Sequence, residues 1–172
     1  MRFSFSLVVL VLALAGCVKY SEITTPPQSV NFTSKTAQEA ASGFSEMQVR
    51  TLVSTAKGSK DDKEVLAVRC TIKGTGFGAS FVTPAKITMP TYVGTADPVT
   101  VTCKKDKETK QVEVKPINMT LARLNQGTVS GGGLLGVAIG AAVKGIAKAA
   151  RDPLKDEFEY PISVRVVFGQ VE

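Results

Sequence analysis

Three cysteines, Cys17, Cys70 and Cys103, carry the most evident chemical potential of this 172-residue chain. A thiol can be acylated, can pair in a disulfide or can bind a metal ion, and its surroundings decide which. The chain contains no histidine and no Cys-x-x-Cys spacing, so we expect no metal site. Cys17 stands alone near the start, whereas Cys70 and Cys103 lie in similar surroundings and form a candidate pair.

The sequence offers little support for catalysis. General acid–base chemistry most often uses histidine, and its absence also excludes Ser-His-Asp and Cys-His arrangements. Carboxylates cluster at residues 61–64 and 156–159, in polar surroundings typical of solvated loops. The glycines at 74–78 and 131–133 lack the contexts of a dinucleotide fingerprint and of a P-loop. We therefore expect no catalytic residues, no enzyme and no dissociable cofactor.

Cys17 ends a leader that is organised like a secretory signal. A basic start at Arg2 precedes an apolar run over residues 7–15, which ends in Leu14-Ala15-Gly16-Cys17. The run is about ten residues long, well short of the roughly 20 that a membrane-spanning helix needs. The last four residues resemble the lipobox of bacterial lipoproteins, in which a signal peptidase cuts before the cysteine, whose thiol and new amine are then acylated. The alternative is an uncleaved anchor with Cys17 as an ordinary buried thiol.

The lipobox resemblance predicts where the chain resides and how it is divided. It implies a signal peptide over residues 1–16, with a diacylglycerol and an N-acyl chain on Cys17 as the membrane anchor. Val18 stands where an aspartate commonly retains such lipoproteins in the inner membrane, so the resemblance implies an outer-membrane protein that faces the periplasm. Residues 17–37 are rich in Ser, Thr and Pro and predict a flexible tether, and residues 38–172 predict a single domain.

Cys70 and Cys103 are the even pair that remains in an exported chain, which favours one disulfide over two free thiols. Each lies in a stretch of alternating apolar and polar residues, which is typical of a half-buried strand. The apolar side of the first stretch carries Leu66, Val68 and Ile72 beside Cys70. We therefore expect a bridge that joins two strands inside the core or near its edge.

Many short strands separated by turn signals indicate an antiparallel β-sandwich. The expected strands cover residues 46–55, 65–73, 79–82, 86–89, 99–104, 111–123 and 162–168. The first two of these are expected to form a hairpin, and residues 36–44 have weak helical character. The predicted fold class is mainly β: a small antiparallel β-sandwich with one Gly/Ala-rich helical segment inserted before the last strand.

Several short motifs between residues 70 and 168 point to one type of module. They are Cys70-Thr71, Thr-Pro-Ala-Lys-Ile at 83–87, Val-Thr-Val-Thr-Cys-Lys at 99–104, the glycines of 131–136 and Tyr160-Pro161. Together they resemble a group of small envelope lipoproteins with a PEGA-like β-sandwich module. The chain departs from that pattern at residues 105–107, Lys-Asp-Lys, where such modules usually carry a Gly-aromatic pair. The resemblance implies a non-catalytic envelope module and identifies no ligand.

Residues 129–150 form a segment rich in glycine and alanine. Gly132, Gly136 and Gly140 recur every four residues, and on a helix they make one smooth stripe that allows close packing. This resembles the glycine-zipper segments of some outer-membrane lipoproteins. The stripe can pack on the sandwich or on a second copy, or it can insert into the membrane. The third interpretation is a loop, because glycine costs up to about 1 kcal/mol per residue in a helix.

The charge balance limits the classes of binding partner that we expect. The chain carries 21 Lys+Arg and 15 Asp+Glu, which can favour anionic lipid head groups or envelope polymers or can simply keep a small domain soluble. Nucleic acid is not expected, because the leader exports the chain and no aromatic residues are interleaved with the basic ones. We expect a non-enzymatic, lipid-anchored structural or adaptor protein with an envelope protein partner or self-association. The alternatives are a self-assembling, membrane-integrating glycine-zipper lipoprotein and a peptidoglycan- or carbohydrate-binding module, which the lack of Trp weakens.

Overall fold

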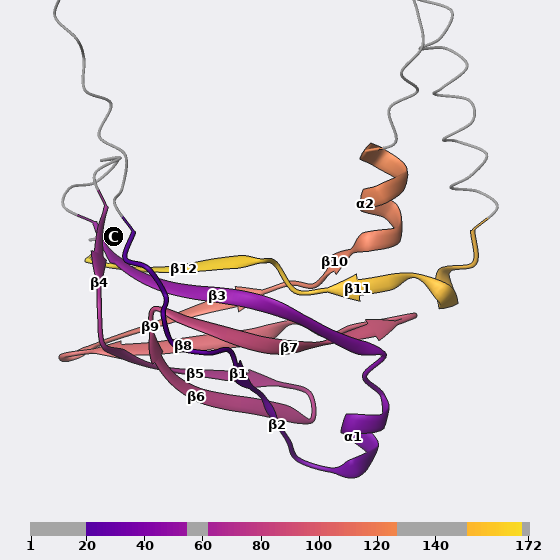
Figure 1. Cartoon of the computed structure of the whole chain (residues 1–172), viewed down its shortest axis with the longest axis horizontal. Coiled ribbons are helices and arrows are strands. Elements are labelled where there is room, and N and C mark those ends of the chain that lie inside the picture. The colour runs from indigo at the N-terminus through magenta and orange to yellow at the C-terminus, as the bar shows by residue number, and fades with distance from the viewer. Residues whose placement is uncertain (1–19, 55–61, 127–150, 170–172) are drawn as a thin grey trace, which may run out of the picture.

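Two stacked β-sheets hold most of the residues that the computed structural model describes, which are 20–54, 62–126 and 151–169 (Figure 1). The larger sheet contains, in order, β10 (Ile117–Asn118), β11 (Glu157–Glu159), β7 (Ala85–Val93), β3 (Gly43–Val53) and β12 (Ser163–Phe168), with β1 (Gln28–Ser29) beside β7 and β4 (Lys63–Val65) beside β3. The smaller sheet contains β2 (Asn31–Phe32), β6 (Phe77–Thr83), β5 (Val68–Gly74), β8 (Val99–Lys105) and β9 (Glu108–Val114). The prediction of a small, mainly β sandwich is confirmed, while the expected helical segment at 129–150 lies outside the described residues.

The core lies between the inner faces of the two sheets. Met47 and Val49 of β3 alternate with more exposed neighbours, and Cys70 and Ile72 of β5 do the same in the opposite sheet. All four side chains are at most 3% exposed. Burying one large apolar side chain contributes about 1.5–3 kcal/mol, so this alternation is the main source of stability.

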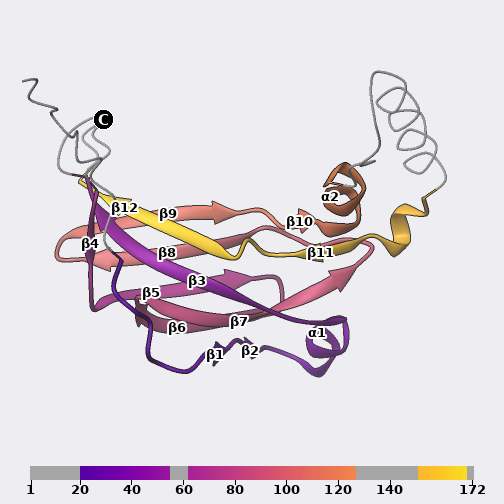
Figure 2. The ribbon, with the colours of Figure 1, turned by 45° about the horizontal axis from the view of Figure 1, so that its top comes forward.

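Two short helices lie at one end of the sandwich (Figures 1 and 2). In α1 (Lys35–Glu39), the Ser34 hydroxyl accepts a hydrogen bond from the Ala37 amide. In α2 (Met119–Gln126), the side chain of Asn118 accepts one from the Leu121 amide. We call this end the helical end. The opposite end, where β4 and the last residues of β3 and β12 lie, is called the Tyr20 end.

The predicted strand over residues 65–73 is in fact two strands in different sheets. β4 pairs with β3 through Val65 and Thr51, whereas β5 begins at Val68 and pairs with β6 and β8. The corner between them is Leu66-Ala67, where Ala67 takes a φ of 59°. Leu66, expected inside, is 51% exposed because it lies on this corner. The predicted hairpin of strands 46–55 and 65–73 is therefore wrong beyond residue 65.

The predicted strand over residues 111–123 is divided: β9 ends at Val114, and residues 117–118 form the short β10 of the other sheet. Pro116 has no amide to donate to a β-ladder, and the chain leaves the smaller sheet there. Residues 119–126 form α2 instead, since Met, Leu, Ala, Arg and Gln all favour a helix. The apolar residues of 117–123 fit both the two-residue period of a strand and the 3.6-residue period of a helix. Their alternation therefore predicted a strand where a helix forms.

The last strand lies at the edge of the larger sheet, in a parallel pairing that its sequence does not show. β12 lies parallel to β3, from Ser163 opposite Gln48 to Phe168 opposite Val53. β3 pairs antiparallel with β7 on its other side. The sandwich is thus mostly antiparallel, with β12 parallel to β3 and the short β1 parallel to β7.

The segment predicted as a flexible tether belongs to the sandwich from residue 20 onward. Gln28 and Ser29 extend β7 as a parallel neighbour, and Asn31 and Phe32 pair with β6 of the other sheet. Val30, between the two short strands, is 6% exposed. The correction has a simple cause: the backbone groups of this polar segment bond to sheet edges, which the sequence alone does not reveal.

Candidate functional site

Tyr20 and Ser21, which follow the predicted lipidation site, are held against the Tyr20 end by contacts with Arg50 and Glu64. We call these contacts the clamp. The ring of Tyr20 lies against the Arg50 guanidinium, with the guanidinium carbon 4.9 Å from the ring centroid. Arg50 also donates to the Ser21 carbonyl at 2.9 Å and to the Glu64 carboxylate at 2.6 Å. The same carboxylate accepts a hydrogen bond from the Ser21 amide at 2.5 Å. Residues from three separate stretches, 20–21, β3 and β4, therefore meet in one charged cluster.

The Glu64 carboxylate is held in its charged form within this cluster. Its side chain is 4% exposed, and that of Arg50 is 12% exposed. Burial raises the pKa of Glu64, but the Ser21 amide and the Arg50 guanidinium outweigh it, so the pKa lies below its ordinary value. The expectation that the acids of 61–64 are solvated is thus wrong for Glu64, because a buried carboxylate requires such partners.

This cluster limits how far the sandwich can lie from Cys17, which itself is outside the described residues. Three peptide units separate Cys17 from Tyr20, and an extended chain spans at most about 3.3–3.6 Å per residue, or about 10 Å in total. The helical end lies at the far side of β3, whose 11 residues at about 3.4 Å each extend about 35 Å. A group attached at Cys17 would therefore lie near the Tyr20 end and far from the helices.

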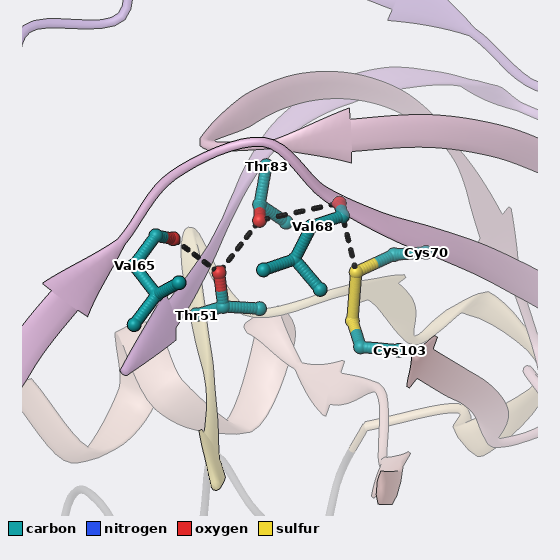
Figure 3. The surroundings of a disulfide bond; sticks show 6 residues. All are labelled: Thr51, Val65, Val68, Cys70, Thr83 and Cys103. Atoms are coloured by element: carbon teal, nitrogen blue, oxygen red, sulfur yellow. Dashed lines mark hydrogen bonds between the residues drawn. A yellow bond between two sulfur atoms is a disulfide. The ribbon is translucent and has the colours of Figure 1, made fainter. Parts of the chain in front are cut away.

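Cys70 and Cys103 form the predicted disulfide, with an S–S distance of 2.00 Å (Figure 3). They lie directly opposite each other on β5 and β8, and both are at most 3% exposed. The bridge therefore joins two neighbouring strands of one sheet inside the core, and it is shielded from solvent.

Two buried threonines connect the sheets beside the disulfide (Figure 3). Thr51 of β3 donates to the Val65 carbonyl at 2.6 Å, and its oxygen lies 2.6 Å from the hydroxyl of Thr83. A hydroxyl has one proton, so Thr83 donates to Thr51, and its 3.4 Å contact with the Val68 carbonyl is the weaker alternative. Because Thr51 and Thr83 belong to different sheets, their bond aligns the two layers at the Tyr20 end.

The helical end contains an open cleft of about 410 Å³. It lies between α1 and the turn that follows β7, and its lining includes Ala37, Phe77, Tyr92, Asp97 and Tyr160. The Tyr160 hydroxyl donates to the Asp97 carbonyl at 2.8 Å. The rings of Phe77 and Tyr160 meet edge to face, with centroids 6.3 Å apart.

The chemistry of the two tyrosines of this cleft is set by their burial. Burial raises the pKa of Tyr160, and the charges of Tyr92 and Asp97 add to that effect. Burial and the Asp97 charge also raise the pKa of Tyr92. Both phenols therefore stay neutral near pH 7. Tyr160 is buried and already donates to the Asp97 carbonyl, whereas the half-buried Tyr92 can offer ring surface and a hydroxyl donor.

A buried carboxylate joins the two chain segments that flank residues 127–150. Asp156 is 2% exposed and accepts hydrogen bonds from Asn118 at 2.7 Å and from Arg151 at 3.2 Å. Next to it, Arg123 of α2 pairs with Glu157 of β11. The expectation that these acids form a solvated cluster is therefore wrong for Asp156. The predicted stripe of glycines, 132, 136 and 140, lies outside the described residues.

Comparison with protein-family models, curated proteins and solved structures finds no match to this chain. In the part of the chain that the structure describes, no helix is long and apolar enough to cross a membrane. The same residues contain no group of three His, Cys, Asp or Glu side chains that could hold a metal ion. Of the predicted site residues, the structure brings Cys70 and Cys103 together. The sequence analysis missed the Tyr20 cluster and the cleft. All three tyrosines of the chain lie in these two sites, but nothing in their sequence spacing relates them.

Proposed function

We propose that this chain is a non-enzymatic, lipid-anchored envelope protein with a structural or adaptor role at the periplasmic face of the outer membrane. In this proposal, acyl chains on Cys17 hold the protein to the membrane. The observation that carries it is the clamp of Tyr20 and Ser21 on Arg50 and Glu64, three residues after the lipobox cysteine. A clamp so close to Cys17 gives the sandwich a defined orientation, which a long flexible tether would not.

The orientation determines which surface is offered to a partner. With Cys17 in the membrane, the Tyr20 end lies within about 10 Å of it, and the helical end projects away. The cleft of Tyr92 and Tyr160 then opens toward the periplasm, at a distance suited to a protein partner. Aromatic residues with neutral polar groups are typical of such contact sites.

Cell fractionation tests the anchor. Residues 1–16 are replaced by an ordinary cleavable secretory signal, and Cys17 is changed to Ser. We expect the unmodified chain to resist carbonate extraction and to carry acyl chains on Cys17 by mass spectrometry, whereas the variant is released by carbonate. An unmodified chain without acyl groups overturns the proposal. A variant that resists carbonate favours the alternative in which residues 129–150 insert into the membrane.

A carbohydrate or peptidoglycan strand is a second candidate occupant of the cleft. Its support is specific: two of the three tyrosines of the chain line this cleft, beside the Asp97 carbonyl. Purified sacculi should then retain the protein, and Tyr92→Ala should abolish retention. Crosslinking in the periplasm distinguishes the adaptor proposal, because it should recover a protein partner that Tyr92→Ala loses.

A further inference from the structure

The outward face of β5, β6, β8 and β9 carries a shallow groove of about 480 Å³. Its polar lining consists of two cations and four hydroxyl groups. We call it the basic groove: Arg69, Thr71, Ser80, Thr102, Lys104 and Thr109. The disulfide lies beneath it, since Cys70 also contributes to the lining.

The two cations of the basic groove face each other. Arg69 of β5 lies directly opposite Lys104 of β8, and residues so paired have Cα atoms about 4.5–5.5 Å apart. Both side chains are exposed, and neither forms an ion pair with a carboxylate of the described residues. Like charges in directly opposed positions destabilise a sheet. Such a pair is costly in the free protein and becomes favourable when an anion lies between the two cations.

Hydroxyl groups complete the lining next to these cations. Thr71 lies opposite both Ser80 and Thr102, so three hydroxyls form one row across the sheet. Thr109 lies opposite Lys104 on the next strand. Two flanking cations with several hydroxyl donors suit a phosphate group, whose oxygens all accept hydrogen bonds.

The basic groove belongs to the Tyr20 end. Arg69 follows Val68, whose partner Thr83 is bonded to Thr51, the neighbour of Arg50 in the Tyr20 cluster. The turn after Lys104 lies at the same end, because Glu108 accepts a hydrogen bond from the Gly169 amide just beyond β12. The cations therefore lie at the end of the sandwich that the acyl anchor would bring to the membrane.

We infer that the basic groove docks on the phosphate head groups of anionic phospholipids in the membrane that holds Cys17. The inference rests on the proposed function, which supplies the membrane and its proximity. The β8–β9 turn carries Lys105 and Lys107 against Asp106 and Glu108, so the charge that would meet the head groups comes from Arg69 and Lys104. One lipid anchor and one basic surface act together, and such paired signals give firmer and better oriented attachment than either alone.

The test uses the whole chain without its acyl group, so that binding depends on the protein surface. The chain with the replaced leader and Cys17→Ser is sedimented with phosphatidylcholine vesicles, with and without phosphatidylglycerol, at low ionic strength. We expect binding only to the anionic vesicles, about thirtyfold weaker binding when both cations are neutralised in R69Q/K104Q, and still weaker binding for the charge-reversed double variant R69E/K104E. R69Q/K104Q serves as a second variant with no added negative charge, and thermal unfolding checks that both variants are folded.

The matched control is K35E/K115E, which changes the net charge equally at two exposed lysines of the helical end. It should bind nearly as well as the unchanged protein. Equal binding to neutral vesicles, or an equal loss with the control, overturns the inference. The two proposals fail separately. A natural chain without acyl groups on Cys17 refutes the proposed function, whereas an acylated natural chain, together with a Cys17→Ser chain that does not bind anionic vesicles, refutes only the groove.

Discussion

The ring of Tyr20 lies against the Arg50 guanidinium, 4.9 Å from ring centroid to guanidinium carbon, three residues after Cys17. This contact adds an orientation to the location that the leader predicts. A lipobox followed by a free tether predicts only that a domain lies somewhere near a membrane. A lipobox followed by a clamp predicts which end of the domain faces the membrane, and so which surfaces remain for partners.

Glu64→Gln should weaken the clamp in a pH-dependent manner. The folded-state pKa of Glu64 lies below its ordinary value of 4.5, so its charge stabilises the fold above that pH. As the pH falls below 4.5 and through the lowered pKa, this contribution is lost. The free energies of unfolding of the variant and the unchanged protein, measured by urea denaturation, should therefore differ at pH 7 and converge at low pH. A constant difference across this range would contradict the role of the charge.

Removal of the disulfide should cost much of the stability of the domain. The cysteines are 33 residues apart, and the chain-entropy model gives about 3–4 kcal/mol for a loop of this size. Urea unfolding of Cys70→Ala/Cys103→Ala should show this loss. Reductant should lower the midpoint of the unchanged protein and leave that of the variant where it is. Equal midpoints for the unchanged protein with and without reductant would show that the bridge does not support the fold.

Thr51→Val should destabilise the contact between the sheets. The change leaves the Val65 carbonyl without its hydroxyl donor and leaves Thr83 only its weaker 3.4 Å bond to the Val68 carbonyl, which costs about 1–3 kcal/mol. Because the two hydroxyls share one bond, the double variant T51V/T83V should lose less than the sum of the single losses. A double-mutant cycle by chemical denaturation measures this coupling. Strict additivity would argue against the shared bond.

Arg69→Glu should stabilise the protein even though it weakens membrane binding. The new carboxylate lies opposite Lys104 and converts a repulsive pair into an attractive one, a gain of about 0.5 kcal/mol. Lys73→Glu is the control, since its partner on β8 is the uncharged Thr100. Thermal unfolding should show a higher midpoint for the first variant only. If Arg69→Glu is more stable than the unchanged protein but binds anionic vesicles less well, the cation pair serves ligand binding at a cost in stability.

Alternation in the sequence was sufficient to predict the sandwich and the inward direction of both cysteines. It failed at Leu66, since a chain that turns a corner between sheets keeps its alternation but changes the surface that each side faces. It failed again after Val114, where the chain passes Pro116 into the short β10 of the other sheet and then into α2. Both failures are matters of which sheet a segment joins, and a two-residue period carries no such information.

The sequence by itself determined the inward faces of the main strands, the single even pair of cysteines and the pattern at residues 14–17 that resembles a lipobox, because each depends on residue types in the chain rather than on its fold. Only the tertiary structure decided that Tyr20 meets Arg50, that Thr51 meets Thr83 and that Arg69 faces Lys104. The physical reason is that these contacts join residues far apart in the chain. They depend on strand order and register, which are set by the packing of the whole core and by hydrogen bonds between distant backbones.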